Sequence, residues 1–220
     1  MHILAIGQSN IANHCGTPAA SDFGDALVDG EVFPLQDPIA GGTGTAGSVW
    51  PRVADRLAGE PWPGSLRLTL TAVGGTSIAE WAPGGPCFEK LTGRLAAGDG
   101  AGVTHVVFQQ GEKDTLLETS AEDYTAHFMR LYDAVTAKIG VVPWVICRSS
   151  YRFGVTNPDV TDAQSKLAAS LPLAVEGPYL DALGPEFRTD DTHFNDAGLE
   201  QLATGLCQAL LTTAPEGSAR

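Results

Sequence analysis

Short apolar runs alternate along the chain with longer stretches whose apolar residues recur every three or four positions. Short runs between turn residues are typical of buried strands, and the longer spacing is typical of amphipathic helices. The expected strands are residues 3–6, 66–73, 104–109 and 141–147, with a weaker one at 173–179. Strands separated by helices pair in parallel through right-handed crossovers. The pattern therefore predicts an α/β fold, a three-layer α/β/α sandwich around a mostly parallel five-stranded sheet.

Three of the expected helices have recognisable starts. Thr119 and Glu122 form a capping-box pattern before a helix with apolar positions at 124, 128, 131, 135 and 139. Asn157 followed by Pro158 is typical of an N-cap and a first helical position. Asn195 is the expected N-cap of the last helix, which carries a leucine-rich face. Shorter helices are expected near residues 49–57 and 88–95.

Length and spacing indicate one domain over residues 1–220. Residues 11–47 are rich in Gly, Pro, Asp and Thr and have little periodicity, so we expect a long loop near the active site. Residues 213–220 are expected to form a flexible tail.

Composition excludes several classes of partner. The formal net charge is -13, so phosphate backbones and anionic membranes are repelled, and we expect neither nucleic-acid nor membrane binding. No apolar run reaches the roughly 20 residues that cross a bilayer. The start of the sequence shows no export signal, which predicts a cytoplasmic protein, or a secreted one if a signal peptide has been removed.

The four cysteines do not have the spacing of a metal site. Cys147 and Cys207 lie in apolar periodic segments and are expected to be buried thiols. Cys15 and Cys87 both lie in segments rich in Gly and Pro, which leaves a disulfide between them open.

Two short motifs at opposite ends of the chain supply the parts of a serine hydrolase. Ser9 lies in Gly-Gln-Ser-Asn at residues 7–10, and Asp190 and His193 lie in Asp-Asp-Thr-His at residues 190–193. A serine hydroxyl must pass its proton to an imidazole, which a carboxylate holds in the right tautomer. We expect Ser9 as nucleophile, His193 as general base and Asp190 as the orienting carboxylate, with Asp191 as the alternative carboxylate.

Other motifs follow other strands. Gly74-Gly75-Thr76-Ser77 follows the second expected strand, and Gln109-Gln110-Gly111-Glu112 follows the third. Because ligands bind beyond the carboxyl ends of parallel strands, these segments should meet Ser9 at one edge of the sheet.

Four blocks together resemble one family of enzymes. They read GQSN at residues 7–10, GGTSIAEW at 74–81, QQGEKD at 109–114 and DDTHFNDAG at 190–198. In this order they resemble the SGNH (GDSL-type) hydrolase superfamily, and within it the branch of sialate O-acetylesterases and acetylxylan esterase-like carbohydrate esterases. The resemblance implies the flavodoxin-like SGNH hydrolase fold and extends over nearly the whole chain.

The resemblance also implies an oxyanion hole. Its donors would be the backbone N–H groups of Ser9 and Gly75, with Gly74 as the alternative glycine, and a side-chain amide from the third block. Many members of the superfamily read Gly-x-Asn-Asp there, whereas this chain has Gly-Glu-Lys-Asp at residues 111–114. Gln110 is the expected third donor, because its amide could replace that of the absent Asn.

Two further residues are expected substrate contacts. Trp81 could stack on a sugar or pack in the core. Glu112 follows the third strand at the same edge, but Glu112 and Asp114 are too close in sequence to bracket a sugar ring as a glycosidase pair would.

The resemblance implies a carboxylic ester hydrolase that removes O-acetyl groups from a small molecule or polysaccharide through an acyl-enzyme, with no metal and no cofactor. The rival functions are a lipase, arylesterase or thioesterase of the same superfamily, and a carbohydrate-binding domain without turnover. Neither the sugar nor the oligomeric state follows from the sequence.

Overall fold

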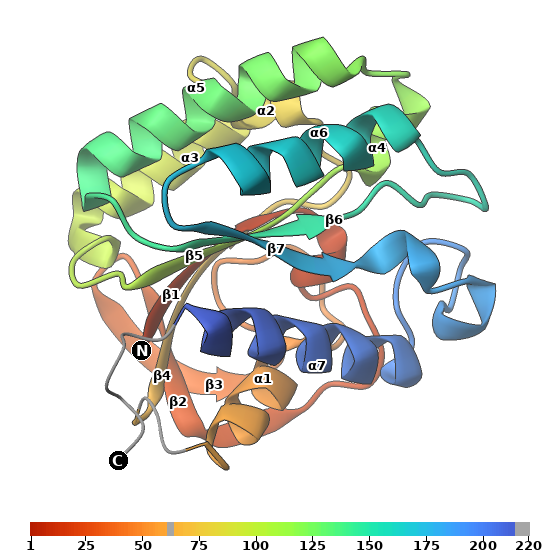
Figure 1. Cartoon of the computed structure of the whole chain (residues 1–220). Coiled ribbons are helices and arrows are strands. Elements are labelled where there is room, and N and C mark those ends of the chain that lie inside the picture. Colours follow the sequence, from red (N-terminus) through yellow and green to blue (C-terminus); the bar gives the residue numbers. More distant parts are fainter. Residues whose placement is uncertain (61–63, 214–220) are drawn as a thin grey trace.

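A computed structural model describes residues 1–60 and 64–213 of the chain (Figure 1). Except for Thr213, the predicted tail lies outside the described residues. In this part the sheet has seven strands in the order β3-β2-β4-β1-β5-β6-β7, and β3 runs antiparallel to β2 while every other pair is parallel. The strands are β1 (His2–Gly7), β2 (Ala20–Val28), β3 (Glu31–Gln36), β4 (Leu66–Ala72), β5 (His105–Gln109), β6 (Trp144–Arg148) and β7 (Ala174–Tyr179).

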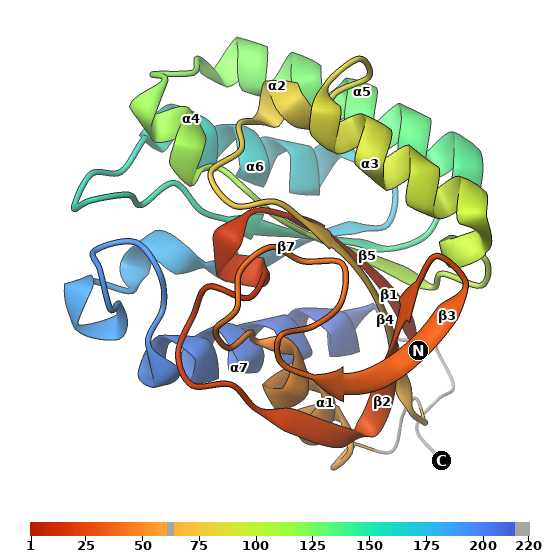
Figure 2. The same cartoon turned by 180° about the vertical axis from the view of Figure 1, so that it is seen from behind.

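Helices cover both faces of this sheet and complete a three-layer sandwich, which confirms the predicted fold class (Figures 1 and 2). Helices α1 and α7 lie on one face, and α2, α3, α5 and α6 lie on the other. The helices are α1 (Trp50–Leu57), α2 (Ile78–Trp81), α3 (Pro86–Arg94), α4 (Glu112–Leu116), α5 (Ala121–Ile139), α6 (Pro158–Ser170) and α7 (Asp196–Thr212).

The central strand β1 shows how the sequence builds this arrangement. Successive side chains of a strand point to opposite faces of the sheet. Ile3 and Ala5 accordingly pack into the core under α1 and α7, and Leu4 and Ile6 pack into the core under the other helices. Because both faces are covered, the strand reads as an unbroken apolar run, which is why the sequence predicts it well.

The expected loop at residues 11–47 is the main error of the sequence-based fold. The segment contains β2 and β3, which raise the number of strands from the predicted five to seven. Asp29 and Gly30 join them in a two-residue turn with φ values of 52° and 81°, the conformation that favours Asp-Gly in hairpins. Most of β3 is exposed at the sheet edge, so its sequence has no apolar alternation.

The helix starts are mostly as predicted. The side chains of Asn157 and Asn195 accept hydrogen bonds from the first turns of α6 and α7, which confirms both N-caps. The start of α5 differs by one residue, because the side chain of Ser120, rather than that of Thr119, accepts the N–H of Asp123.

All four cysteines are buried and free. Cys15 lies in the core beneath α1 and α7, whereas Cys87 lies in the core on the opposite face of the sheet. The sheet separates the two thiols, so the disulfide that the sequence left open does not form.

The strand order determines where a ligand can bind. From β1 the chain forms β2, β3 and β4 on one side of this strand and then crosses to β5 on the other, so β1 is the point at which the order reverses. In open α/β sheets the crevice outside the carboxyl ends of such strands is the usual binding site. Ser9 follows β1 at this position.

Candidate active site

Ser9 begins a single turn of 3-10 helix, Ser9–Ile11, directly beyond β1. Gly7 makes this exit feasible, because it has φ 156° and a Cβ there would lie 1.9 Å from the carbonyl oxygen of Gln109. Ser9 is 2% exposed. Its hydroxyl is buried and has no hydrogen-bond partner among the described residues. The structure therefore presents an unengaged hydroxyl at the point where the strand order reverses.

Asp190 and His193 form a closely bonded pair. Oδ2 of Asp190 lies 2.7 Å from Nδ1 of His193, and Oδ1 accepts the backbone N–H of the same histidine at 2.7 Å. A carboxylate only accepts, so Nδ1 carries the proton and Nε2 has a free lone pair. Burial raises the pKa of Asp190, but these hydrogen bonds outweigh it and hold the pKa below 3.8. Asp191, the alternative, has φ 55° and forms no bond to the ring in the described residues.

Asn10 links the segment after β1 to the loop that carries this pair. Its Nδ2 donates to the carbonyl oxygen of Thr192 at 3.2 Å, and its Oδ1 accepts the N–H of Phe194 at 3.2 Å. Thr192 and Phe194 are the chain neighbours of His193, and Asn10 is the neighbour of Ser9. The hydroxyl of Ser9 and the ring of His193 are not hydrogen-bonded to each other in the described structure. Their loops are held together through the residues beside them.

Arg188 is hydrogen-bonded to the loop that carries His193, a contact that the sequence does not predict. Its buried guanidinium donates to the carbonyl oxygens of Leu180 at 3.0 Å, Leu183 at 3.1 Å and Thr192 at 2.6 Å. It also lies over the ring of Phe194 at 4.5 Å from the centroid. Burial lowers the pKa of Arg188. These contacts fix the backbone on both sides of His193.

A second histidine lies against the first. The rings of His14 and His193 stack with centroids 5.4 Å apart and planes 18° apart. Nε2 of His14 lies 3.0 Å from Oγ1 of Thr43, which also accepts the N–H of Gly74 at 2.8 Å. Burial, and then the nearby His193, lower the pKa of His14. His14 and Thr43 thus link the histidine loop to the glycine turn after β4.

The glycine turn separates the two alternatives for the oxyanion hole. The N–H of Gly74 is engaged by Thr43. For the N–H groups of Gly75 and Ser9, the described residues provide no acceptor. Gly75 has φ 73°, a conformation that a residue with a side chain rarely adopts. The geometry therefore favours Gly75 over Gly74.

Gln110 is not placed as expected for the third donor. It is fully buried, and its Nε2 lies 2.9 Å from the carbonyl oxygen of Thr76 and 2.5 Å from Oδ2 of Asp114, so both amide protons are engaged. Gln8 is different, because its Nε2 is buried next to Ser9 and has no acceptor among the described residues. Its amide is a donor that the sequence analysis did not consider.

The two expected substrate contacts are also wrong in this structure. Trp81 has no exposed surface, and its indole N–H donates to Oγ1 of Thr76 at 3.0 Å. Glu112 has no exposed surface either, and its Oε1 accepts from Asn10 at 2.8 Å and from Gln109 at 2.7 Å. Trp81 is a core residue, and Glu112 is a buried hydrogen-bond acceptor for Asn10 and Gln109.

The described residues, 1–60 and 64–213, contain no group of three or more His, Cys, Asp or Glu side chains arranged to hold a metal ion. None of the helices in these ranges is both long enough and apolar enough to cross a membrane.

Comparison with known proteins identifies the family. Residues 53–212 match the family described as carbohydrate esterase, sialic acid-specific acetylesterase. The chain belongs to this carbohydrate esterase family. The match includes the Asp-Asp-Thr-His motif and begins after Ser9. It confirms the resemblance stated from the four sequence blocks.

Individual relatives show the same architecture. A probable carbohydrate esterase of Arabidopsis thaliana, At4g34215, is 29% identical over 150 residues, which are 67% of this chain and 56% of that protein. Its X-ray structure superposes with a TM-score of 0.71 at 21% identity over 96% of this chain and 98% of the other. NanS gives 0.68 at 16% identity, covering 96% of both chains. A carbohydrate acetylesterase of Xanthomonas citri gives 0.69 at 18% identity, covering 97% of this chain and 56% of that one.

Proposed function

We propose that the protein is a serine esterase that removes O-acetyl groups from an acetylated carbohydrate. The observation that carries this proposal is the bonded pair of Asp190 and His193, which Asn10 holds beside the unengaged hydroxyl of Ser9. This arrangement has the base and its orienting carboxylate already in place. Membership of the carbohydrate esterase family supports the choice of substrate class.

The reaction begins with Ser9 as nucleophile. Its proton passes to Nε2 of His193 while Oγ forms a bond to the acetyl carbon. The carbonyl electron pair moves to the oxygen, which the N–H groups of Ser9 and Gly75 stabilise, with the amide of Gln8 as the third donor. Such donors act on charge that develops only in the transition state. The C–O bond to the alcohol then breaks, and His193 returns its proton to the leaving oxygen.

Water completes the cycle. His193 takes a proton from a water molecule, whose oxygen attacks the acetyl carbon of the acyl-enzyme. The bond to Oγ breaks, acetate leaves and Ser9 regains its proton from His193. Asp190 remains ionised throughout and stabilises the imidazolium that forms in each half.

Acetate release tests this proposal. The purified protein should release acetate from acetylated xylan, an O-acetylated sialic acid or ethyl acetate, and Ser9→Ala should abolish turnover without lowering the melting temperature. Ser65→Ala is the matched control, because Ser65 is exposed just before β4 at the opposite edge of the sheet. Undiminished acetate release by Ser9→Ala would remove the mechanism. A preference for octanoyl over acetyl esters would favour a lipase or thioesterase instead.

A further inference from the structure

One surface hollow is walled by residues that contact the catalytic histidine. It has a volume of about 300 Å³, and His14, Thr17, Ala46, Thr189, Asn195 and Asp196 are among its lining residues. We call it the His14 hollow. Three other hollows of similar size indent the described surface, and none of them is lined by a residue with a described contact to His193.

Two walls of the His14 hollow hold His193 itself. The ring of His14 stacks on the ring of His193. The backbone N–H of Thr189 donates to the carbonyl oxygen of His193 at 2.8 Å. The hollow therefore lies on the histidine side of the candidate active site.

The position of the hollow beside His193 matters because His193 transfers a proton to the leaving alcohol. The imidazole must return its proton to the oxygen of the leaving alcohol, so that oxygen has to lie within hydrogen-bond reach of Nε2. The rest of the alcohol must then extend over surface next to His193. The carbonyl oxygen of the acetyl group must instead meet the oxyanion donors, the N–H groups of Ser9 and Gly75.

The walls carry groups suited to hydroxyl recognition. The lining includes the hydroxyls of Thr17 and Thr189, which donate to Asp196 and His193 and whose oxygens can still accept, together with the amide of Asn195 and the carboxylate of Asp196. Asp196 is held in place because its Oδ1 accepts the backbone N–H of Thr17 at 2.8 Å and Oδ2 accepts the hydroxyl of Thr17 at 2.8 Å. A pocket with a few fixed polar groups is typical of a small polar ligand.

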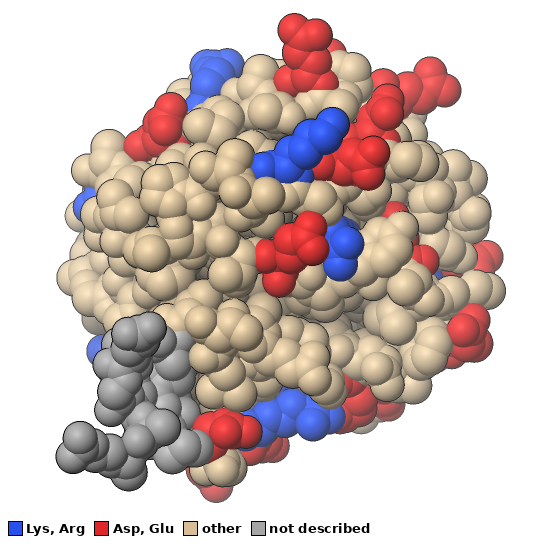
Figure 3. All heavy atoms as spheres, viewed as in Figure 1, with Lys and Arg blue, Asp and Glu red and all other residues tan. Residues whose placement is uncertain are grey.

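The charge of the walls excludes an acidic ligand. No Lys or Arg lines the hollow. The guanidinium of Arg52 reaches Asp196 at 2.8 Å but also pairs with Glu200 at 3.2 Å, so it is already neutralised. On the face shown in Figure 3, the basic side chains are scattered, several of them beside acidic ones, and they form no basic patch. With a net charge of -13, the protein offers a carboxylate no compensating partner here.

We propose that the His14 hollow binds the alcohol part of the ester, and that this alcohol is an uncharged sugar rather than a sugar acid. The inference rests on the proposed acetylesterase function and specifies its substrate. It differs from the specificity in the description of the family that the chain matches.

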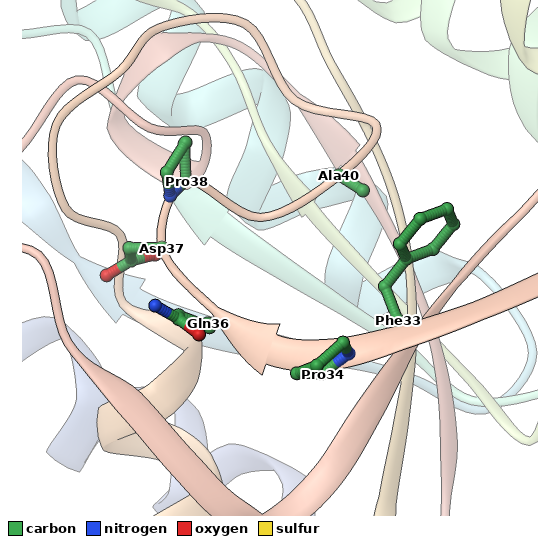
Figure 4. Close-up of a pocket in the computed structure, with 6 residues that line it drawn as sticks. All are labelled: Phe33, Pro34, Gln36, Asp37, Pro38 and Ala40. Carbon is green, nitrogen blue, oxygen red and sulfur yellow. The ribbon is translucent and has the colours of Figure 1, made fainter.

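A second hollow provides the control. It has a volume of about 280 Å³ and is lined by Phe33, Pro34, Gln36, Asp37, Pro38 and Ala40 at the end of β3 (Figure 4). Ala40 and Ala46 are both half-buried alanines in the wall of a hollow. Replacing each by tryptophan makes the same chemical change in two different places.

The experiment compares kcat/KM for two esters, methyl xyloside acetate and ethyl acetate. The ethanol part of ethyl acetate is too small to reach the hollow. Ala46→Trp should lower the ratio of the first value to the second at least tenfold, mainly through KM, whereas Ala40→Trp should leave both values unchanged. Wild-type protein should also prefer methyl xyloside acetate to an O-acetylated sialic acid at least tenfold. Asp196→Asn, an exposed substitution that removes the negative charge from the wall and leaves Arg52 with Glu200 as its acidic partner, should reduce that preference at least threefold.

An unchanged ratio in Ala46→Trp, or a preference for the sialic acid ester, overturns the proposal while leaving the esterase function intact. If Ala46→Trp does not fold, the preference of the wild type and its reduction in Asp196→Asn decide the question. If the wild type releases acetate from none of the three esters, the proposed function fails and the hollow loses its role with it.

Discussion

Asn10 donates a hydrogen bond to the backbone carbonyl of Thr192, 182 residues away in the sequence. The bond joins the residue after the candidate nucleophile to the residue before the candidate base. The other proton of the same amide goes to the buried carboxylate of Glu112. One side chain therefore holds three segments of the chain together beneath the active site.

The first prediction concerns this amide. Asn10→Ala leaves the buried N–H of Phe194 without its acceptor, which typically costs about 1 to 3 kcal/mol for a buried group, and removes one of the donors to Thr192 and Glu112. We expect a lower melting temperature and a kcat reduced at least tenfold, with KM little changed, because His193 loses its support. Asn157→Ala is the control, since it removes the cap of α6 and a bond to the carbonyl of Thr119, neither of which involves His193. An Asn10→Ala variant with wild-type kcat would show that the bond does not position the base.

The second prediction concerns Asp190. Its pKa is lowered in the folded state, so its contribution to stability is complete above 3.8 and is lost only as the pH falls through the lower folded value. The bond between Asp190 and His193 should therefore persist down to pH 3.8, and a decline of activity above that pH should occur while the protein is still folded. Circular dichroism and kcat/KM measured on the same samples test this. Unfolding that coincides with the loss of activity would contradict it.

Asp190→Asn extends that prediction. The amide can donate to the imidazole, which favours the wrong tautomer, and the positive charge formed on His193 loses its partner. We expect a decrease in kcat of about 1,000-fold or more, as is typical of such triads. Asp191→Asn should retain activity, because Asp191 does not contact the ring.

The third prediction concerns Thr43. Thr43→Val preserves the shape of the side chain but removes the group that accepts the N–H of Gly74 and meets His14. The turn that orients Gly75 loses its anchor, so kcat should decrease about tenfold, with little change in melting temperature. Thr136→Val on the distant helix α5 is the matched control. Equal kcat values for the two variants would show that Thr43 does not position the turn.

The fourth prediction separates the two glutamines. Gln8→Met should lower kcat about 100-fold, the usual loss for one oxyanion donor, and it removes two long hydrogen bonds of 3.4 Å that Oε1 accepts from Gln110 and Gly111. Gln110→Met should instead lower the melting temperature, because Thr76 and Asp114 lose their buried donor. A Gln8→Met variant with full activity would return the role of third donor to another group.

The sequence predicted those parts of the fold that local patterns specify. Buried strands such as β1 read as apolar runs, and Asn157 and Asn195 mark helix starts by their own chemistry. The hairpin of β2 and β3 was not predicted, because an exposed edge strand needs no alternation of apolar and polar residues. The Asp29-Gly30 turn was the signal that could have revealed it.

The candidate site divides in the same way. Short motifs predicted Ser9, Asp190 and His193 as candidates, and the three-residue spacing of Asp190 and His193 fits the hydrogen bond between them. The motifs after the strands predicted Gln110 and Trp81 as site residues, but a motif does not determine where a side chain points, and both side chains are fully buried. His14, Thr43 and Arg188 act through contacts between distant segments, and no local pattern marks them.

The most direct test of the central claim is the site of covalent modification by diethyl p-nitrophenyl phosphate. The phosphoryl group should transfer to a single residue, Ser9, identified by mass spectrometry of peptides, and Asp190→Asn should slow this transfer at least tenfold. Modification of a different residue, with Ser9 unlabelled in a fully inhibited protein, would contradict the account.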